Sequence, residues 1–124
     1  MGGACSLMWL ASPGIKVYLG LGATDMRKSI DSLSVLVSEH LNQNPFSGHF
    51  FVFCNRGRTI LKILYWDRNG FCLWHKRLEK DKFRWPEYRS EVHEISDREL
   101  RWLLEGLDIE QAHAHGNLDY QSVY

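Results

Sequence analysis

The chain has 124 residues, with 15 Lys and Arg against 15 Asp and Glu, so its formal net charge is zero. Hydrophobic residues make up 44% of the sequence, which also contains five tryptophans, and this excludes an intrinsically disordered protein. No apolar run reaches the ~18–20 residues that a membrane-spanning helix needs. We therefore expect one globular domain with its own core, located in the cytoplasm and without a membrane partner.

The predicted elements lie within residues 15–107, between a flexible leader (1–14) and a flexible tail (108–124) that has no hydrophobic period. A first strand is predicted at 15–22. Apolar residues then recur at helical spacing and predict an amphipathic helix over 24–41: Met26, Ile30, Leu33, Val37 and Leu41. Thr24 is its predicted N-cap, and Asp25 suits the positive end of the helix dipole.

Three segments rich in β-branched and aromatic residues follow, at 50–53, 60–66 and 71–78. The Gly-containing turns "NRGR" and "DRNG" separate them, which predicts two antiparallel hairpins. A further short strand is predicted at 83–85 and ends at Pro86.

A second helix is predicted to start at Ser96, where Ser96 and Glu99 form a capping box and Ile95 and Leu100 a hydrophobic staple. Leu100, Leu103, Leu104 and Leu107 give its apolar face. The predicted fold is therefore a single α+β domain, a mostly antiparallel β-meander packed by an amphipathic helix, with a second short C-terminal helix.

Charge is unevenly distributed along the chain. Residues 56–84 contain nine Lys or Arg and three acids, a net charge of +6, whereas residues 85–124 carry −6. Basic residues interleaved with aromatic ones suit phosphate contact and base stacking, although such charges often form a solvated face and such aromatics a core. Eight cations are predicted to contact nucleic acid: Arg56, Arg58, Lys62, Lys76, Arg77, Lys80, Lys82 and Arg84. Of these, Lys76 and Arg77 are expected to emerge together at the rim of the sheet.

A series of ordered segments supports a family resemblance: "TDMRKSID" (24–31), "NPFSGHFFVF" (44–53), "KILYWD" (62–67), "GFCLWHKRLEK" (70–80) and "FRWP" (83–86). In this order they resemble the TnpB-type, Orf2-like accessory proteins of the insertion-sequence-66 family, over roughly residues 15–107. The resemblance implies a bacterial mobile-element protein that supports DNA transposition together with other element-encoded proteins.

The matching motifs contain further positions whose role the resemblance does not specify: Thr24, Asp25, Met26, Arg27, Lys28, Trp66, Asp67, Glu79, Trp85 and Pro86. The chain also departs from the family pattern. Thr59 and Ile60 stand where relatives often carry an Asp-Arg pair, and Ser29 replaces a common glycine.

No catalytic residue, metal ligand or cofactor is predicted. Asp25 and Asp31 are six residues apart, more than the three or four that bring helix side chains together, so they do not suggest a two-metal nuclease. The three cysteines are widely spaced and predict no disulfide framework. Cys54, Cys72 and His75, with His113 and His115, are the alternative of a structural zinc site, but their spacing matches no zinc finger, ribbon or knuckle.

The leading hypothesis is a non-enzymatic accessory protein that binds element DNA through a basic sheet rim. The alternative is an adaptor that docks on the transposase, on another element protein or on a second copy of itself. Its acidic C-terminal residues would then face a basic partner: Glu99, Glu105, Asp108 and Glu110. A latent metal-dependent nuclease is the third hypothesis.

Overall fold

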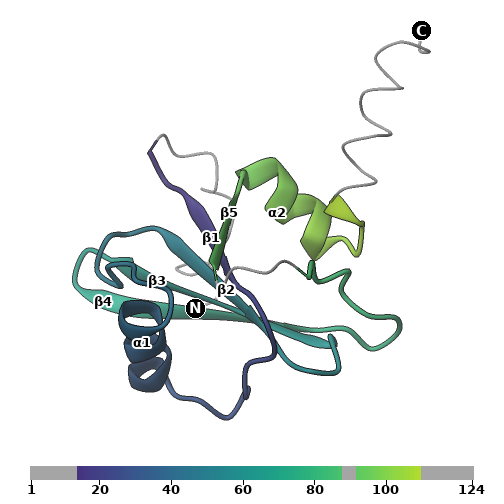
Figure 1. The fold of residues 1–124 in the computed structure, drawn as a ribbon, viewed down its shortest axis with the longest axis horizontal. Helices are drawn as coiled ribbons and strands as arrows, with labels where there is room; N and C mark the ends of the chain where they lie inside the picture. The colour runs from purple at the N-terminus through teal and green to yellow at the C-terminus, as the bar shows by residue number, and fades with distance from the viewer. Residues whose placement is uncertain (1–13, 88–91, 110–124) are drawn as a thin grey trace, which may run out of the picture.

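The computed structural model describes residues 14–87 and 92–109, which form a five-stranded sheet with one helix against each face (Figure 1). The strands follow the order β4-β3-β2-β1-β5 across the sheet. In chain order the elements are β1 (Val17–Gly20), α1 (Ile30–Glu39), β2 (Phe50–Cys54), β3 (Ile60–Asp67), β4 (Gly70–Arg77), β5 (Val92–Ile95) and α2 (Asp97–Leu104). The predicted α+β class is therefore confirmed.

Strand pairing agrees with the predicted meander and adds a parallel pair. β2, β3 and β4 pair antiparallel in sequence order, and the β3–β4 register runs without a gap from Ile60↔Arg77 to Asp67↔Gly70. β1 lies parallel to β2 on one side and antiparallel to β5 on the other. The sheet is thus mostly antiparallel, and α1 belongs to the crossover that joins the two parallel strands.

The predicted strand at 83–85 is wrong. This segment has no regular secondary structure, and it is held to the sheet by the Phe83 N–H, which donates to the Arg58 carbonyl oxygen at 2.7 Å. The fifth strand is instead β5, where Ile95 pairs with Val17 at the opposite edge of the sheet. Propensity alone did not distinguish an extended segment from a paired strand.

Side chains alternate between two hydrophobic cores. On the α1 face, Leu33 and Val37 of the helix pack with Phe51, Phe53 and Leu64 of the sheet. On the other face, α2 contributes two leucines to a larger core that also contains buried residues of β1, β2 and β3 and the segment after β4: Leu100, Leu103, Val17, Val52, Ile63, Phe83 and Trp85. β2 is buried along its whole length because both faces of the sheet are covered.

The predicted start of α2 is confirmed, and the predicted start of α1 is wrong. α2 begins as predicted, because the Ser96 hydroxyl accepts from the Glu99 N–H and the Glu99 side chain accepts from the Ser96 N–H. α1 does not begin at Thr24, since its N-cap is Ser29, whose hydroxyl accepts from the Ser32 N–H. The Asp25 carboxylate accepts from the Arg27 N–H at 2.9 Å, and this local turn competes with helix formation.

Within the described residues, no helix combines the length and the apolar character that crossing a membrane requires. The predicted leader, apart from Gly14, and the tail from residue 110 lie outside the part of the chain that the structure describes.

Candidate nucleic-acid interface

The eight cations predicted to contact nucleic acid separate into distinct groups. Lys62 lies on the α1 face, and its Nζ donates to the Met26 carbonyl oxygen at 2.8 Å. Lys76 lies on the opposite face, and its Nζ donates at 2.9 Å to the carbonyl oxygen of Leu104, the last residue of α2. A lysine in this position satisfies a free helix carbonyl and opposes the negative end of the dipole. Both lysines therefore stabilise the fold, and they lie on opposite sides of the sheet.

Arg77 differs from Lys76 although it follows it directly. Its side chain points to the α1 face, where its Nε donates to the Glu79 carboxylate at 3.0 Å. Neighbouring residues of a strand point to opposite faces, so Lys76 and Arg77 do not form one continuous surface as the sequence suggested.

Four of the five remaining cations line a groove beside the turn between β2 and β3. Two backbone hydrogen bonds join this turn to the segment after β4: Leu78 N–H to the Thr59 oxygen at 2.8 Å, and Phe83 N–H to the Arg58 oxygen at 2.7 Å. The groove has a volume of about 660 Å³ and is lined by Arg58, Leu78, Lys80, Asp81, Lys82, Phe83, Arg84, Glu105 and Gly106. Four cations thus face two carboxylates there, and we call this surface the basic groove.

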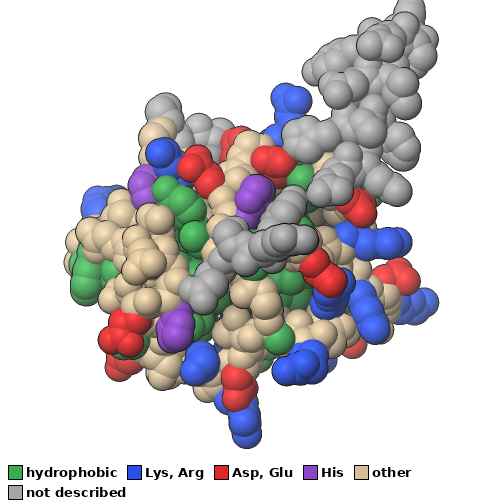
Figure 2. Space-filling model, in the orientation of Figure 1, with side chains coloured by type: hydrophobic (Ala, Val, Ile, Leu, Met, Phe, Trp, Pro, Cys, Tyr) green, Lys and Arg blue, Asp and Glu red, His purple; other side chains and the backbone are tan. Residues whose placement is uncertain are grey.

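Figure 2 shows Lys and Arg side chains gathered on the right and lower right of the molecule. In Figure 1 this is the side where the β2–β3 turn and the segment after β4 lie. Arg56 belongs to the same turn and is exposed. The groove cations therefore come from two chain segments that the sheet brings together.

Local chemistry fixes both segments. The Asn55 side-chain oxygen accepts from the Thr59 and Ile60 N–H groups at 2.9 and 3.0 Å, which closes the β2–β3 turn. Arg58 and Asp81 have positive φ angles of 62° and 65°, a left-handed conformation that is uncommon outside glycine. These two residues lie in the two chain segments that contribute cations to the groove.

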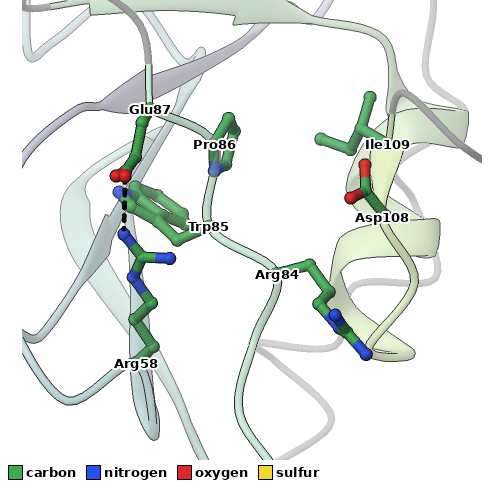
Figure 3. Close-up of a pocket in the computed structure, with 7 residues that line it drawn as sticks. All are labelled: Arg58, Arg84, Trp85, Pro86, Glu87, Asp108 and Ile109. Atoms are coloured by element: carbon green, nitrogen blue, oxygen red, sulfur yellow. Dashed lines mark ion pairs between the residues drawn. The ribbon is translucent and has the colours of Figure 1, made fainter.

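A smaller pocket of about 330 Å³ shares Arg58 and Arg84 with the basic groove. Figure 3 shows the Arg58–Glu87 ion pair on one side of this pocket and Asp108 and Ile109 on the other. The Arg58–Glu87 separation is 3.4 Å, and the Glu87 side chain is 71% exposed. An ion pair this exposed contributes only about 0–1 kcal/mol to stability.

The aromatic residues next to the groove cations belong to the core. Phe83 is 1% exposed and Trp85 is 5% exposed. Removing such a ring from a core costs roughly 3–5 kcal/mol, whereas one stacked nucleobase returns ~1–3 kcal/mol. Trp74 packs partly buried against the same core. The interleaved aromatics of this segment therefore do not form a stacking surface.

Trp66 lies in an aromatic group at the β3–β4 turn, together with Phe46 and Phe71. The three ring centroids are 5.0–5.3 Å apart, and Phe46 is 57% exposed. Trp66 and Phe71 lie at the Asp67–Gly70 end of the β3–β4 hairpin, whereas Arg58 and Leu78 of the groove lie next to its other end. This exposed aromatic group is thus a separate surface.

The motif residues 24–28 connect the sheet to α1. The Thr24 N–H donates to the Cys54 oxygen at 2.9 Å, and the Lys28 N–H donates to the Asp25 oxygen at 3.1 Å. The Arg27 side chain donates to the Asp25 carboxylate and lowers the pKa of Asp25 from 3.8 to about 2. This loop, Gly20 and α1 line a pocket of about 200 Å³, in which a side chain at Gly20 would collide with Phe53 at 2.8 Å.

The residues of the zinc alternative are not brought together. Cys54 is on β2 and Cys72 on β4, with β3 between them, and His75 points to the other face. Burial raises the pKa of the Cys54 thiol to about 11, which keeps it protonated. Across residues 14–87 and 92–109, no three His, Cys, Asp or Glu side chains form a group that could hold a metal ion. His113 and His115 lie outside the described residues.

Several partners in this region were not predicted. Glu87 pairs with Arg58 across 29 residues, and no local pattern in the sequence connects them. The Lys76–Leu104 contact also required knowledge of where α2 packs. Glu99 was expected both in the capping box and on a partner-facing acidic surface. It makes the predicted capping-box bond, accepting from the Ser96 N–H at 2.7 Å.

Comparison with known proteins supports the family resemblance. Residues 15–114 match the IS66 Orf2-like protein family. The chain is 39% identical over 94 residues to "Uncharacterized protein y4hO" of Sinorhizobium fredii, covering 76% of this chain and 82% of that protein. It is 32% identical over 97 residues to "Uncharacterized protein y4jC" of the same organism, covering 78% and 83%. No solved structure matches significantly. The chain belongs to the IS66 Orf2-like family of insertion-sequence proteins.

Proposed function

We propose that this chain is a non-enzymatic accessory protein of its insertion sequence and supports transposition by binding element DNA through the basic groove. The family suggests the accessory role, and the groove suggests how it is carried out. The proposed phosphate ligands are Arg56, Arg58, Lys80, Lys82 and Arg84, whereas Lys62 and Lys76 serve as internal anchors.

The observation that carries this proposal is the arrangement of the groove cations. Arg58 comes from the β2–β3 turn, and Lys80, Lys82 and Arg84 come from the segment after β4, while backbone hydrogen bonds fix the distance between the two segments. Cations held on two fixed segments bind a polyanion with little loss of backbone entropy. Asp81 and Glu105 also line the groove and keep its net charge moderate. The phosphate contacts would make its affinity dependent on salt.

The test is fluorescence anisotropy of a labelled duplex across a salt series. If the four cations that line the groove each neutralise one phosphate, log K should fall against log salt with a slope of about −3.6. Lys82→Gln should make the slope shallower by about one unit. Arg98→Gln, which removes an exposed cation of α2, is the matched control and should leave the slope unchanged. Failure of the intact chain to bind duplex at 50 mM salt would reject the proposal.

A second candidate function is a protein adaptor, and the aromatic group of Phe46, Trp66 and Phe71 favours it. Phe46 is exposed in this group, and the other two rings are half-buried. Exposed aromatic residues are enriched in the centres of protein interfaces. A pull-down with the element's transposase, with and without nuclease treatment, separates the two functions. Retention that survives nuclease treatment but is lost in Phe46→Ala would support the adaptor, whereas retention that requires DNA would support the basic groove.

A further inference from the structure

The segment that forms one wall of the basic groove has a strict alternation of exposure. Lys82 and Arg84 are exposed, whereas Phe83 and Trp85 are buried. The chain is therefore extended here, with cations on the outer side and aromatic rings on the inner side. The charged groups and the aromatic rings of this segment therefore lie on different sides of the backbone.

The alternation is fixed by contacts on both sides of the segment. The Phe83 N–H donates to the Arg58 oxygen at 2.7 Å, which prevents the backbone from rotating. The Phe83 and Trp85 rings pack in the same core as Leu100 and Leu103 of α2. Turning either ring outward would open that core, so the rings are not available to a ligand in the groove.

The spacing of the outer cations suits a sugar–phosphate chain. Lys82 and Arg84 are two residues apart in an extended segment, which places them ~6.6 Å apart along the chain. This is comparable with the separation of neighbouring phosphates along one nucleic-acid strand. Arg58, from the β2–β3 turn, lines the same groove. The site thus offers cations from two chain segments but no aromatic surface for bases.

We infer that the basic groove binds the sugar–phosphate backbone of double-stranded DNA and makes no stacking contact with its bases. This inference rests on the proposed function and specifies which form of nucleic acid the site takes. Duplex is favoured because it carries about twice the charge per unit length of a single strand. Single-stranded DNA, whose affinity for proteins commonly depends on base stacking, is the poorer ligand.

The experiment compares three labelled probes of equal length: a duplex, one of its single strands, and a single strand made of abasic residues. Each is titrated with the intact chain and with Phe46→Ala, which removes the most exposed member of the separate aromatic group. In both proteins the normal and abasic single strands should bind within about twofold of each other. The duplex should bind more tightly than both, with a steeper salt slope of about −3.6 against −2.8 for four contacts.

The outcomes separate this inference from the function on which it rests. A normal single strand that binds about fivefold or more tightly than the abasic strand would reveal base stacking and overturn the inference, while leaving DNA binding in place. Single strands that bind more tightly than duplex would also overturn it. Absence of binding by all three probes at 50 mM salt would reject the proposed function and this inference together.

Discussion

Lys76 and Lys82 lie six residues apart in the same basic stretch but occupy different environments. Lys76 is half-buried on β4 and donates to the last carbonyl of α2, whereas Lys82 is exposed on the wall of the basic groove. Lys62 resembles Lys76, since it is on a strand and holds the loop before α1. In this molecule the two strand lysines hold other segments in place, whereas Lys82, in a loop, is exposed.

The cations of the basic stretch therefore have two structural roles: some stabilise packing, and others are exposed at the surface. A positively charged segment that crosses a sheet and then leaves it contributes first to packing and then to the surface. The net charge of +6 over residues 56–84 therefore overstates the charge that a DNA molecule could contact. Substitutions that affect one group and leave the other unchanged test the distinction directly.

The largest effect is expected from removing three groove cations together. The triple variant Lys80→Gln, Lys82→Gln, Arg84→Gln should bind duplex about a hundredfold or more weakly at 100 mM salt, with a slope shallower by almost three units. Its free energy of unfolding should stay within about 0.5 kcal/mol of the parent, because these are surface positions. A control that removes the same charge at the exposed Lys16, Lys28 and Arg98 should bind normally. Equal losses in both variants would mean that net charge, and not the groove, determines binding.

The second prediction concerns the anchoring lysine. Lys76→Met should reduce the free energy of unfolding by about 1–2 kcal/mol, because the Leu104 oxygen loses its charged donor. The same substitution at Lys80 is the matched control and should cost almost nothing. Urea denaturation of both variants measures this. For DNA binding, Lys80→Met should have the larger effect and Lys76→Met the smaller one. A shallower salt slope in Lys76→Met than in Lys80→Met would contradict the division between strand and loop cations.

The third prediction tests the helix that Lys76 anchors. Ser96→Ala removes the acceptor of the Glu99 N–H and should cost about 1 kcal/mol. Ser96→Asp keeps an N-cap acceptor and should restore most of the loss. Thermal denaturation followed by circular dichroism provides the measurement, and an unchanged midpoint in Ser96→Ala would show that this cap does not contribute to stability.

The smallest effect on stability is expected at Asp25, an exposed carboxylate that lies outside the basic stretch. Because Arg27 lowers the folded-state pKa of Asp25 from 3.8 to about 2, the ionised carboxylate stabilises the fold above pH 3.8. This contribution is lost as the pH falls toward 2. Asp25→Asn should therefore unfold at slightly lower urea concentration than the parent at pH 7, and the difference should disappear near pH 2. A difference that is the same at both pH values would assign it to another cause.

Much of the fold was predictable because its signals are local. The β2–β3–β4 meander follows from turn residues between apolar runs, and the capping box of Ser96 and Glu99 identifies the start of α2 to the residue. The start of α1 was misplaced because Asp25 bonds its own neighbour Arg27 instead of beginning a helix. The residue that caps α1 is Ser29, whose hydroxyl accepts from the Ser32 N–H.

The candidate site was harder to predict because its organisation is tertiary. The sequence identified the cations, but it did not show that α2 would cover the face of β4 from which Lys76 extends. It also did not show that Phe83 and Trp85 would turn inward while Lys82 and Arg84 turn outward. Both facts depend on contacts between residues far apart in the chain, which local periodicity does not record.

The position of β1 affects how the protein is made. Its partners are β2, which follows soon after it, and β5, whose Ile95 pairs with Val17 near the start of the domain. During synthesis on the ribosome, one edge of β1 therefore stays unpaired until almost the whole domain has been made. Unpaired strand edges of this kind favour aggregation. A chain cut after residue 87 would keep that edge open permanently. Premature termination before β5 should consequently yield insoluble protein instead of a shorter functional one.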